Sequence, residues 1–450
     1  MGETEEVSRT SKKTMRTGLS LCVGTPEILL PATGIDRTKW PVIACDQYTS
    51  QPDYWESIAR EVADFPSSFH IILPEAYLEN PGPIGLVERI ASINLHMEQY
   101  LSEGILMSIG ECMVLVDRQT PVASSRKGLV LEVDLEKYDY EPGADNLIRA
   151  TEGTVLERIP PRMRIRRDAP LEIPHIQLLV DDPERTIIEP LAKQCEDGRY
   201  EILYDQELMA GGGHIRGYRI PKDAIRENRM SDALSALSSY KEHGLLFAVG
   251  DGNHSLATAK AHWNSIKAAV SPTHPARYAL VELINIHDEG LVFEPIHRVL
   301  FHADLDDFIS KSCCLVPEMD LLISERMSVE NAILMAQTID PQVQPIPVFQ
   351  DNSAVVFTFS KTPSKLAVGS MQLLIDAYLA GNPEARVDYI HGEEAVMALS
   401  ADHIGMLFPA ISKDTFFETI VNEGVLPRKT FSMGESFEKR YYMECKLIVQ

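Results

Sequence analysis

The 450-residue chain carries 42 Lys and Arg against 66 Asp and Glu, a net charge of −24 at pH 7, and 44% of its residues are hydrophobic. This composition is typical of a globular protein with two or three hydrophobic cores. The strong negative charge argues against nucleic acid and anionic membrane as partners, because both would be repelled.

The chain carries no export or membrane signal that we recognise. Residues 1–19 are polar and of mixed charge, which predicts a flexible tail and no signal sequence. No long apolar span follows, so no membrane insertion is predicted. The seven cysteines are scattered and form no CxxC pair, as expected for reduced thiols. We therefore expect a cytoplasmic protein, and the sequence leaves open whether it forms a homo-oligomer.

Apolar runs and helical spacings alternate along the chain. The segments predicted as strands are 41–48, 70–74, 113–118, 128–135, 173–182, 355–360 and two strands within 278–300 that the turn HDEG separates. The segments predicted as helices are 54–65, 84–104, 370–381 and 414–424. This mixture predicts an α+β (mixed α/β) fold, with mixed sheets and flanking helices.

No repeat or obvious linker divides the chain, so the predicted domain boundaries are approximate. After the tail we expect an N-terminal α/β domain at 20–125, a central domain at 126–305 and a C-terminal α/β region at 306–450.

The stretch GLLFAVGDGNHSLATAKAHW, residues 244–263, has the order of an apolar strand, a glycine turn and a helix. Gly250 and Gly252 permit a sharp turn, and Asn253 or Ser255 can cap the helix. Free backbone N–H groups at such a helix start form an anion site.

The side chains of this turn divide by charge. Asp251 would repel a phosphate, so we expect it to bind a metal, act as a base or accept a hydroxyl. His254 can donate to a phosphoryl oxygen, and Lys260, two turns further on, can reach back toward it. An ordinary capped helix with a solvated aspartate is the alternative, and spacing alone does not separate the two.

Six arginines fall within residues 147–170. Arg162, Arg164 and Arg166 alternate with apolar residues, which on a strand would give one cationic face suited to phosphate or carboxylate. A solvated charged face is the alternative interpretation.

Glu152 and Thr154 lie close in sequence to Arg149 and Arg158. An acid that neighbouring arginines keep ionised can act as a base. Glu152 is therefore a candidate general base, and the other three are candidates for binding phosphate.

Two further segments carry candidate substrate-binding residues. GGGHIRGYRI lacks the spacing of a phosphate loop and predicts a glycine hairpin, from which His214 could project into a site. Asp46 and Tyr48 follow an apolar run, a common place for functional side chains in α/β sheets, although Asp46 also suits a turn.

The last third adds weaker candidates. His297 and Arg298 in FEPIHRVL would bind phosphate or be structural. Lys429 in LPRKTFSMG lies in a loop that resembles an anion-binding loop. No HExxH, GxSxG or GxGxxG motif occurs, which argues against zinc proteolysis, a serine elbow and nicotinamide chemistry.

The segment VGDGNHSLATA resembles the DGHHR motif of domain-of-unknown-function family 1015. The similarity extends through PVIACDQYTSQPDYW, RATEGTVLERIPPR, LINIHDEGLVFEPIHRVL and LPRKTFSMG. The same turn also resembles that of free serine kinases of the ParB and sulfiredoxin superfamily. This resemblance implies a ParB/sulfiredoxin-like core, in which the turn binds nucleotide phosphates and an acid acts as base toward a serine hydroxyl.

Asp251, Gly252 and His254 match the motif, whereas Asn253 replaces its first histidine and Ser255 its arginine. Loss of that arginine removes a phosphate clamp.

Two residues elsewhere are candidates to replace the clamp, namely Arg149 and Arg158. Glu152 stands where the broader family has a His-Glu pair, with Thr151 in place of the histidine.

Together these features predict a kinase-like phosphotransferase that acts on a small hydroxylated metabolite, such as free serine or phosphoserine, with ATP or ADP and Mg²⁺. A phosphohydrolase and a non-catalytic nucleotide-binding regulatory module are the alternatives. The residues expected to catalyse are Glu152, Asp251 and His254, with Asp251 also the magnesium ligand. Those expected at the phosphates or nucleotide are Arg149, Thr154, Arg158, Gly252, Asn253, Lys260, His297 and Arg298. Those expected at the substrate are Asp46, Tyr48, His214 and Lys429.

Overall fold

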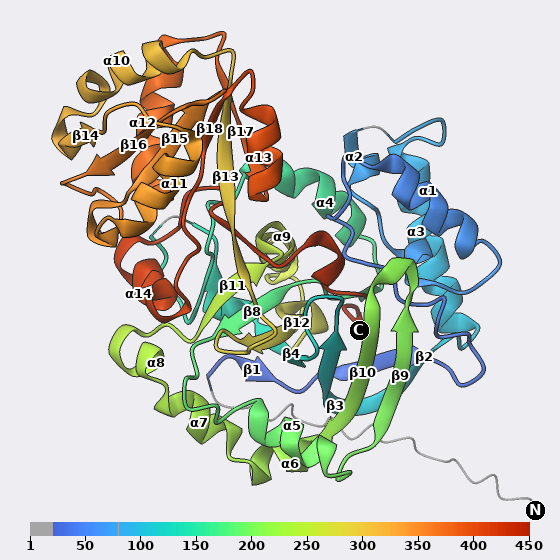
Figure 1. The fold of residues 1–450 in the computed structure, drawn as a ribbon. Helices are drawn as coiled ribbons and strands as arrows, with labels where there is room; N and C mark the ends of the chain where they lie inside the picture. The colour runs from blue at the N-terminus through green and yellow to red at the C-terminus, as the bar shows by residue number, and fades with distance from the viewer. Residues whose placement is uncertain (1–20, 80, 142) are drawn as a thin grey trace, which may run out of the picture.

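The computed structural model describes residues 21–79, 81–141 and 143–450, so the predicted tail at 1–19 lies outside the described residues. Two large sheets organise the chain (Figure 1). The first sheet has eleven strands, paired both parallel and antiparallel. Its main path runs β5 (Tyr138–Asp139), β6 (Ile148–Arg149), β11 (Phe247–Asp251), β8 (Gln177–Val180), β12 (Tyr278–Asn285), β4 (Arg126–Asp134), β3 (Leu106–Gln119), β10 (Gly213–Pro221) and β9 (Ile202–Leu208), with β1 (Val23–Gly24) on β4 and β2 (Glu27–Pro31) on β3.

The second sheet has seven strands, all paired antiparallel. Its path runs β14 (Leu321–Ile323), β16 (Ser353–Phe359), β15 (Ile346–Gln350), β18 (Ile404–Met406), β13 (Phe293–Phe301) and β17 (Arg386–His391), with β19 (Phe431–Met433) on β13. A small third sheet pairs β7 (Leu171–Glu172) with β20 (Lys446–Leu447).

Helices flank both sheets, which confirms the predicted mixed α/β class (Figure 1). They are α1 (Pro52–Glu61), α2 (Ala76–Glu79), α3 (Leu86–Ser102), α4 (Ile159–Arg166), α5 (Glu189–Glu196), α6 (Lys222–Glu227), α7 (Met230–Ala236), α8 (Ser238–His243), α9 (Asn253–Ile266), α10 (Leu305–Leu315), α11 (Val329–Thr338), α12 (Ala367–Gly381), α13 (Glu393–Leu399) and α14 (Lys413–Glu423). None of these described helices is long and apolar enough to cross a membrane.

Strand β4 shows how the first sheet separates two cores. Leu129 and Leu131 pack with Trp263 of α9 on one face. Val130 points to the opposite face, where it joins the core that contains Trp40 and Tyr442. Because successive side chains of a strand point to opposite faces, an apolar strand such as β4 contributes to both cores at once.

The predicted turn HDEG connects β12 to β13, but these strands belong to different sheets. The chain therefore crosses from the first sheet to the second at this turn. The domain boundary predicted at residue 125 falls between β3 and β4, which pair with each other, and the one at 305 falls at the start of α10. The division into domains stays a prediction.

The strand predicted at 41–48 is wrong, because the segment is a loop with one isolated bridge, Ile43 to Tyr441. Its backbone bonds instead to the end of the chain, with Ala44 N–H donating to the Arg440 carbonyl at 2.8 Å. The apolar side chains are buried because this distant segment covers them.

Two further strand predictions fail. Residues 68–71 form a 3-10 helix capped by the Ser67 hydroxyl, which leaves no strand at 70–74. Arg162, Arg164 and Arg166 lie on α4 and not on a strand. Prolines in the first turn of α4 favour the helix, because proline presets a helical φ where no intrahelical N–H bond is needed.

The C-terminal segment, residues 436–448, returns from the second sheet to the first. Arg440 donates to Glu282 Oε2 at 2.7 Å and to Glu444 Oε2 at 2.5 Å, and all three side chains are at most 3% exposed. Arg118 and Arg126 donate to main-chain carbonyls of residues 437–439. The end of the chain is thus held against the first sheet by paired charges and hydrogen bonds.

Gly252 precedes α9 in the left-handed region, with φ +80°, and an added Cβ would lie 3.0 Å from Ile176 Cα. We expect Gly252→Ala to destabilise the protein by about 2 kcal/mol in urea unfolding, from backbone strain plus contact. Gly244→Ala is the matched control, because its φ is +63° with nothing within 4 Å. An equal loss in both variants would contradict the contact with Ile176.

Replacing Arg440 by Met should destabilise the protein by about 3–5 kcal/mol, because two buried carboxylates lose their common partner. Chemical unfolding monitored by circular dichroism measures the change. The exposed pair Lys193–Asp197 provides the control, and Lys193→Met should leave stability almost unchanged. A small effect of the Arg440 variant would show that the C-terminal segment is held by other contacts.

Candidate functional site

The turn between β11 and α9 has the predicted order of strand, turn and helix. Thr151 binds the Asn253 side chain at the start of α9 through two hydrogen bonds. The Thr151 N–H donates to Asn253 Oδ1, and the Thr151 hydroxyl accepts from Asn253 Nδ2, each at 3.3 Å. The Thr151 hydroxyl donates to the Val249 carbonyl at 2.6 Å. The Asn253 side chain therefore ties two segments together, and only its backbone N–H remains available for a phosphate.

The first turn of α9 offers two such N–H groups. In an α-helix the residues of the first turn have no acceptor four positions earlier, so the N–H groups of Asn253 and His254 have no intrahelical partner. The positive end of the helix dipole adds to the attraction for an anion.

His254 lies beside these N–H groups as a neutral imidazole. Val155 N–H donates to His254 Nε2 at 3.3 Å, so Nε2 is an acceptor and the proton resides on Nδ1. Burial and the nearby charges of Arg162, Arg158 and Arg428 lower the pKa of His254 to about 4. Three cationic side chains therefore lie near the start of α9, although the protein as a whole is acidic.

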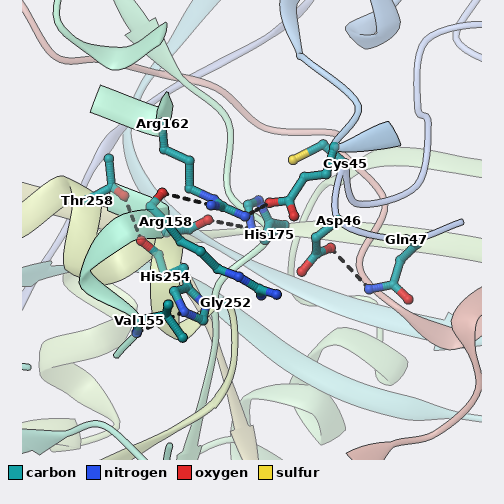
Figure 2. Close-up of polar contacts among 12 residues, drawn as sticks. Cys45, Asp46, Gln47, Val155, Arg158, Arg162, His175, Gly252, His254 and Thr258 are labelled. Carbon is teal, nitrogen blue, oxygen red and sulfur yellow. Dashed lines mark hydrogen bonds and ion pairs between the residues drawn. The ribbon is translucent and has the colours of Figure 1, made fainter. Parts of the chain in front are cut away.

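Two of these arginines are available to bind an anion. The guanidinium groups of Arg158 and Arg428 make no hydrogen bond or ion pair with any residue that the structure describes, whereas Arg162 pairs with Glu75. Figure 2 shows Arg158 extending past His254. Arg158 thus lies where a phosphate at the helix start would need a cation.

A pair of carboxylates, Asp251 and Glu152, lies near the same turn. Asp251 accepts from Gly252 N–H at 2.9 Å and lies 3.4 Å from Lys439 Nζ. Glu152 Oε1 accepts from Lys429 N–H at 3.2 Å. Burial raises the pKa of Glu152, the charges of Lys429 and Lys439 oppose the rise, and Asp251 adds to it. The two carboxylates are thus close enough to influence each other.

The structure describes no group of three or more His, Cys, Asp or Glu that could hold a metal. Both oxygens of Asp251 already have partners, Gly252 and Lys439. The magnesium-ligand role of Asp251 stays a prediction.

Thr154 Oγ1, predicted to bind phosphate, is buried without a hydrogen-bond partner among the described residues.

A third group of polar side chains borders the same helix turn. Ser255 Oγ lies 2.7 Å from His175 Nε2, and His175 Nδ1 lies 3.0 Å from the Tyr442 hydroxyl. Asp46 lies nearby: burial opposes its ionisation, but the charges of His175 and Lys439 and a hydrogen bond from Gln47 hold the pKa of Asp46 below its usual value. Figure 2 shows His175 in the middle of the group, with His254 to one side and Asp46 to the other.

Three predicted residues point elsewhere. Arg149 pairs with Asp145 and donates to the His243 carbonyl at 2.9 Å. Lys260 is buried and donates to the Leu135 carbonyl at 2.9 Å, so it does not reach back to the turn.

His214 is the third. It belongs to β10, and its Nε2 lies 2.8 Å from Asp205 Oδ1 on the neighbouring β9. Strand β10 is five strand spacings from β11, about 24 Å away. These three residues are left out of the site because secondary structure holds their side chains at other contacts.

Arg298 positions a loop of the site through hydrogen bonds to its backbone. Its fully buried guanidinium donates to the carbonyls of Lys429 and Arg428, both at 3.0 Å, and thereby shapes the loop whose N–H reaches Glu152. His297 is buried and accepts from Phe408 N–H at 3.1 Å, and burial lowers its pKa to about 4. Tyr48 stacks on Tyr54, with ring centroids 4.0 Å apart.

The sequence interpretation missed four residues of the site: Glu75, His175, Lys439 and Tyr442. Their only signal was a polar residue inside an apolar stretch, as in IPHIQLL, or inside the C-terminal run KRYYMECKLIV. Such signals do not show which distant segment the residue meets.

Removing the Arg158 charge should raise the pKa of His254 from about 4 toward the ordinary 6.5, because that charge disfavours the imidazolium. A histidine-selective NMR titration measures this, with His254→Gln assigning the signal. Arg164→Met, which removes an exposed charge from α4, the helix that follows Arg158, is the control and should change nothing. An unchanged pKa in Arg158→Met would place the Arg158 guanidinium away from His254.

Comparison with known proteins places the chain in a family. No curated protein matches it. Its fold is distantly similar to a free serine kinase in complex with AMP (TM-score 0.37, 11% identity, 70% of this chain and 90% of the other), a conserved hypothetical protein from Pyrococcus furiosus (0.33, 11%, 70% and 90%) and SbnI from Staphylococcus aureus with a C-terminal truncation (0.33, 14%, 68% and 82%). Similarity this distant supports no inference about chemistry. The model of the DUF1015 family, proteins of unknown function, matches residues 29–318, well over half of the chain, and the protein therefore belongs to that family.

Proposed function

We propose that the protein is a phosphotransferase that moves a phosphoryl group from a nucleotide to the hydroxyl of a small metabolite. One observation carries the proposal. Glu152, a carboxylate with a raised pKa, lies near a helix start that also has two arginines nearby, Arg158 and Arg428, whose guanidinium groups have no partner among the described residues. Phosphoryl transfer needs positioning, charge neutralisation and a group that accepts the hydroxyl proton, and this combination supplies all three.

The phosphates would bind at the first turn of α9. The N–H groups of Asn253 and His254 have no intrahelical partner at the helix start. Arg158 and Arg428 would neutralise the phosphate charge, and the neutral His254 would donate from Nδ1. The resemblance of the DGNHS turn supports a nucleotide, ATP or ADP, as the donor.

Glu152 would be the general base. A carboxylate whose pKa is raised holds a proton more readily, so it accepts one from a hydroxyl more effectively than an ordinary glutamate. Asp251 is less suited to this role, because Gly252 N–H and Lys439 already occupy its two oxygens. In the absence of nucleotide, we assign Asp251 the role of holding Lys439 and the glycine turn in place.

The acceptor would be a small hydroxylated metabolite such as free serine. Asp46, which stays ionised, would attract its ammonium group. Magnesium would enter with the nucleotide, because Mg²⁺ usually takes one or two carboxylates and completes its shell with phosphates and water. Asp251 is the carboxylate that we propose for it, exchanging Lys439 for the ion when the nucleotide binds, and Mg²⁺ would neutralise phosphate charge.

Glu152→Gln should slow phosphoryl transfer by about 100-fold or more while leaving nucleotide binding intact, because the amide cannot accept the proton. Phosphorus NMR of ATP or ADP with Mg²⁺ and free serine measures the rate. In the wild type the rate should rise with pH through the raised pKa of Glu152, since only the ionised form is a base.

Arg164→Met is again the control and should transfer at the wild-type rate. Full activity of Glu152→Gln would refute the assignment of the base. Release of free phosphate from phosphoserine without any transfer would instead indicate a phosphohydrolase, and nucleotide binding without turnover a regulatory module.

A further inference from the structure

The proposed transfer leaves one set of contacts unused, a chain of three polar side chains behind the first turn of α9. Ser255 Oγ lies 2.7 Å from His175 Nε2, and His175 Nδ1 lies 3.0 Å from the Tyr442 hydroxyl. The Tyr442 oxygen also accepts the N–H of Cys45 at 3.0 Å. A serine, an imidazole and an orienting hydroxyl in this order are the parts of an activated nucleophile.

The hydrogen bonds allow the tautomer that this role needs. The Tyr442 oxygen has two lone pairs, so it can accept from both Cys45 N–H and His175 Nδ1–H. Its own proton is then directed to the Cys45 thiol, with which it shares a side-chain hydrogen bond. In this arrangement His175 Nε2 carries a lone pair and accepts from the Ser255 hydroxyl.

Two carboxylates, Asp46 and Glu75, lie within electrostatic reach of His175. The charge of His175 lowers the pKa of Asp46, so the two groups attract each other when both are charged. The charge of His175 also acts to lower the pKa of Glu75. Glu75 already pairs with Arg162, however, so it attracts His175 less than Asp46 does.

Ser255 is well placed for a reaction at the helix start. It is the third residue of α9, in the same turn as the N–H groups of Asn253 and His254. Both Ser255 and His175 are partly exposed, so a ligand at this turn can reach the hydroxyl. The charge that develops on a reacting phosphoryl group would be stabilised by the helix start and by Arg158.

We propose that Ser255 is a nucleophile toward phosphorus held at the start of α9, with His175 as its base and Tyr442 as a positioning residue. Ser255 Oγ forms the new O–P bond, the bond from phosphorus to its leaving group breaks with its electron pair, and the serine proton moves to His175 Nε2. The choice of phosphorus rests on the proposed function, whereas activation of the hydroxyl rests on the hydrogen bonds alone.

A fluorophosphonate probe tests the nucleophile without any nucleotide. Ser255 should form a covalent phosphonate with loss of fluoride, located by peptide mass spectrometry. Labelling at this position should vanish in Ser255→Ala and slow by about 100-fold or more in His175→Gln. Ser265→Ala, at the far end of the same helix, is the matched control and should label at the wild-type rate.

Thermal unfolding of each variant shows whether it is folded. Should His175→Gln be unfolded, Tyr442→Phe keeps the test decisive: it should lower the maximal labelling rate about tenfold and not the affinity for the probe. No adduct on Ser255 in the wild type, or a folded variant of His175 or Tyr442 that labels at the wild-type rate, would overturn the proposal.

Phosphoryl transfer from ATP to serine, followed on the same proteins, separates this proposal from the proposed function. Labelled Ser255 without transfer supports the nucleophile and refutes the kinase. Transfer that survives in Ser255→Ala, with no probe adduct in the wild type, does the reverse.

Discussion

The buried guanidinium of Arg440 is the interaction on which the site depends. It lies between Glu282 of the first sheet and Glu444 of its own segment, with almost no exposure to solvent. A buried charge without a partner is costly, so the C-terminal segment has essentially one place to lie. That placement brings Lys439 to Asp251 and Tyr442 to His175. Residues far apart in sequence therefore meet because three buried charges must be paired.

The site brings both signs of charge together around a single turn. Cations gather near the start of α9, where the helix dipole is also positive, and burial together with the charges of three arginines lowers the pKa of His254. The carboxylates Glu152 and Asp251 lie near the same turn, each in contact with a lysine residue. An acidic protein can attract a phosphate in this way, because the local field at a binding site outweighs the repulsion of distant, screened surface charges.

Local chemistry explains which sequence predictions succeeded. The glycine turn before α9 was predictable because the left-handed conformation of Gly252 and the following helical spacing are properties of neighbouring residues. The strand considered for Arg162, Arg164 and Arg166 was wrong, because the alternation of charged and apolar residues was given more weight than the prolines that begin α4. The strand at 41–48 failed because burial there comes from the C-terminal segment and not from a neighbouring strand.

The sequence by itself determined the mixed α/β class, the strand, turn and helix around DGNHS, and the candidate roles of Glu152 and Asp251, because these follow from local pattern and residue chemistry. Only the tertiary structure decided that Arg158 faces the helix start while Arg149 turns away, and that His175 meets Ser255. Direction and pairing of this kind depend on strand order and on buried charge partners, which bring together residues as distant in sequence as His175 and Tyr442, 267 positions apart.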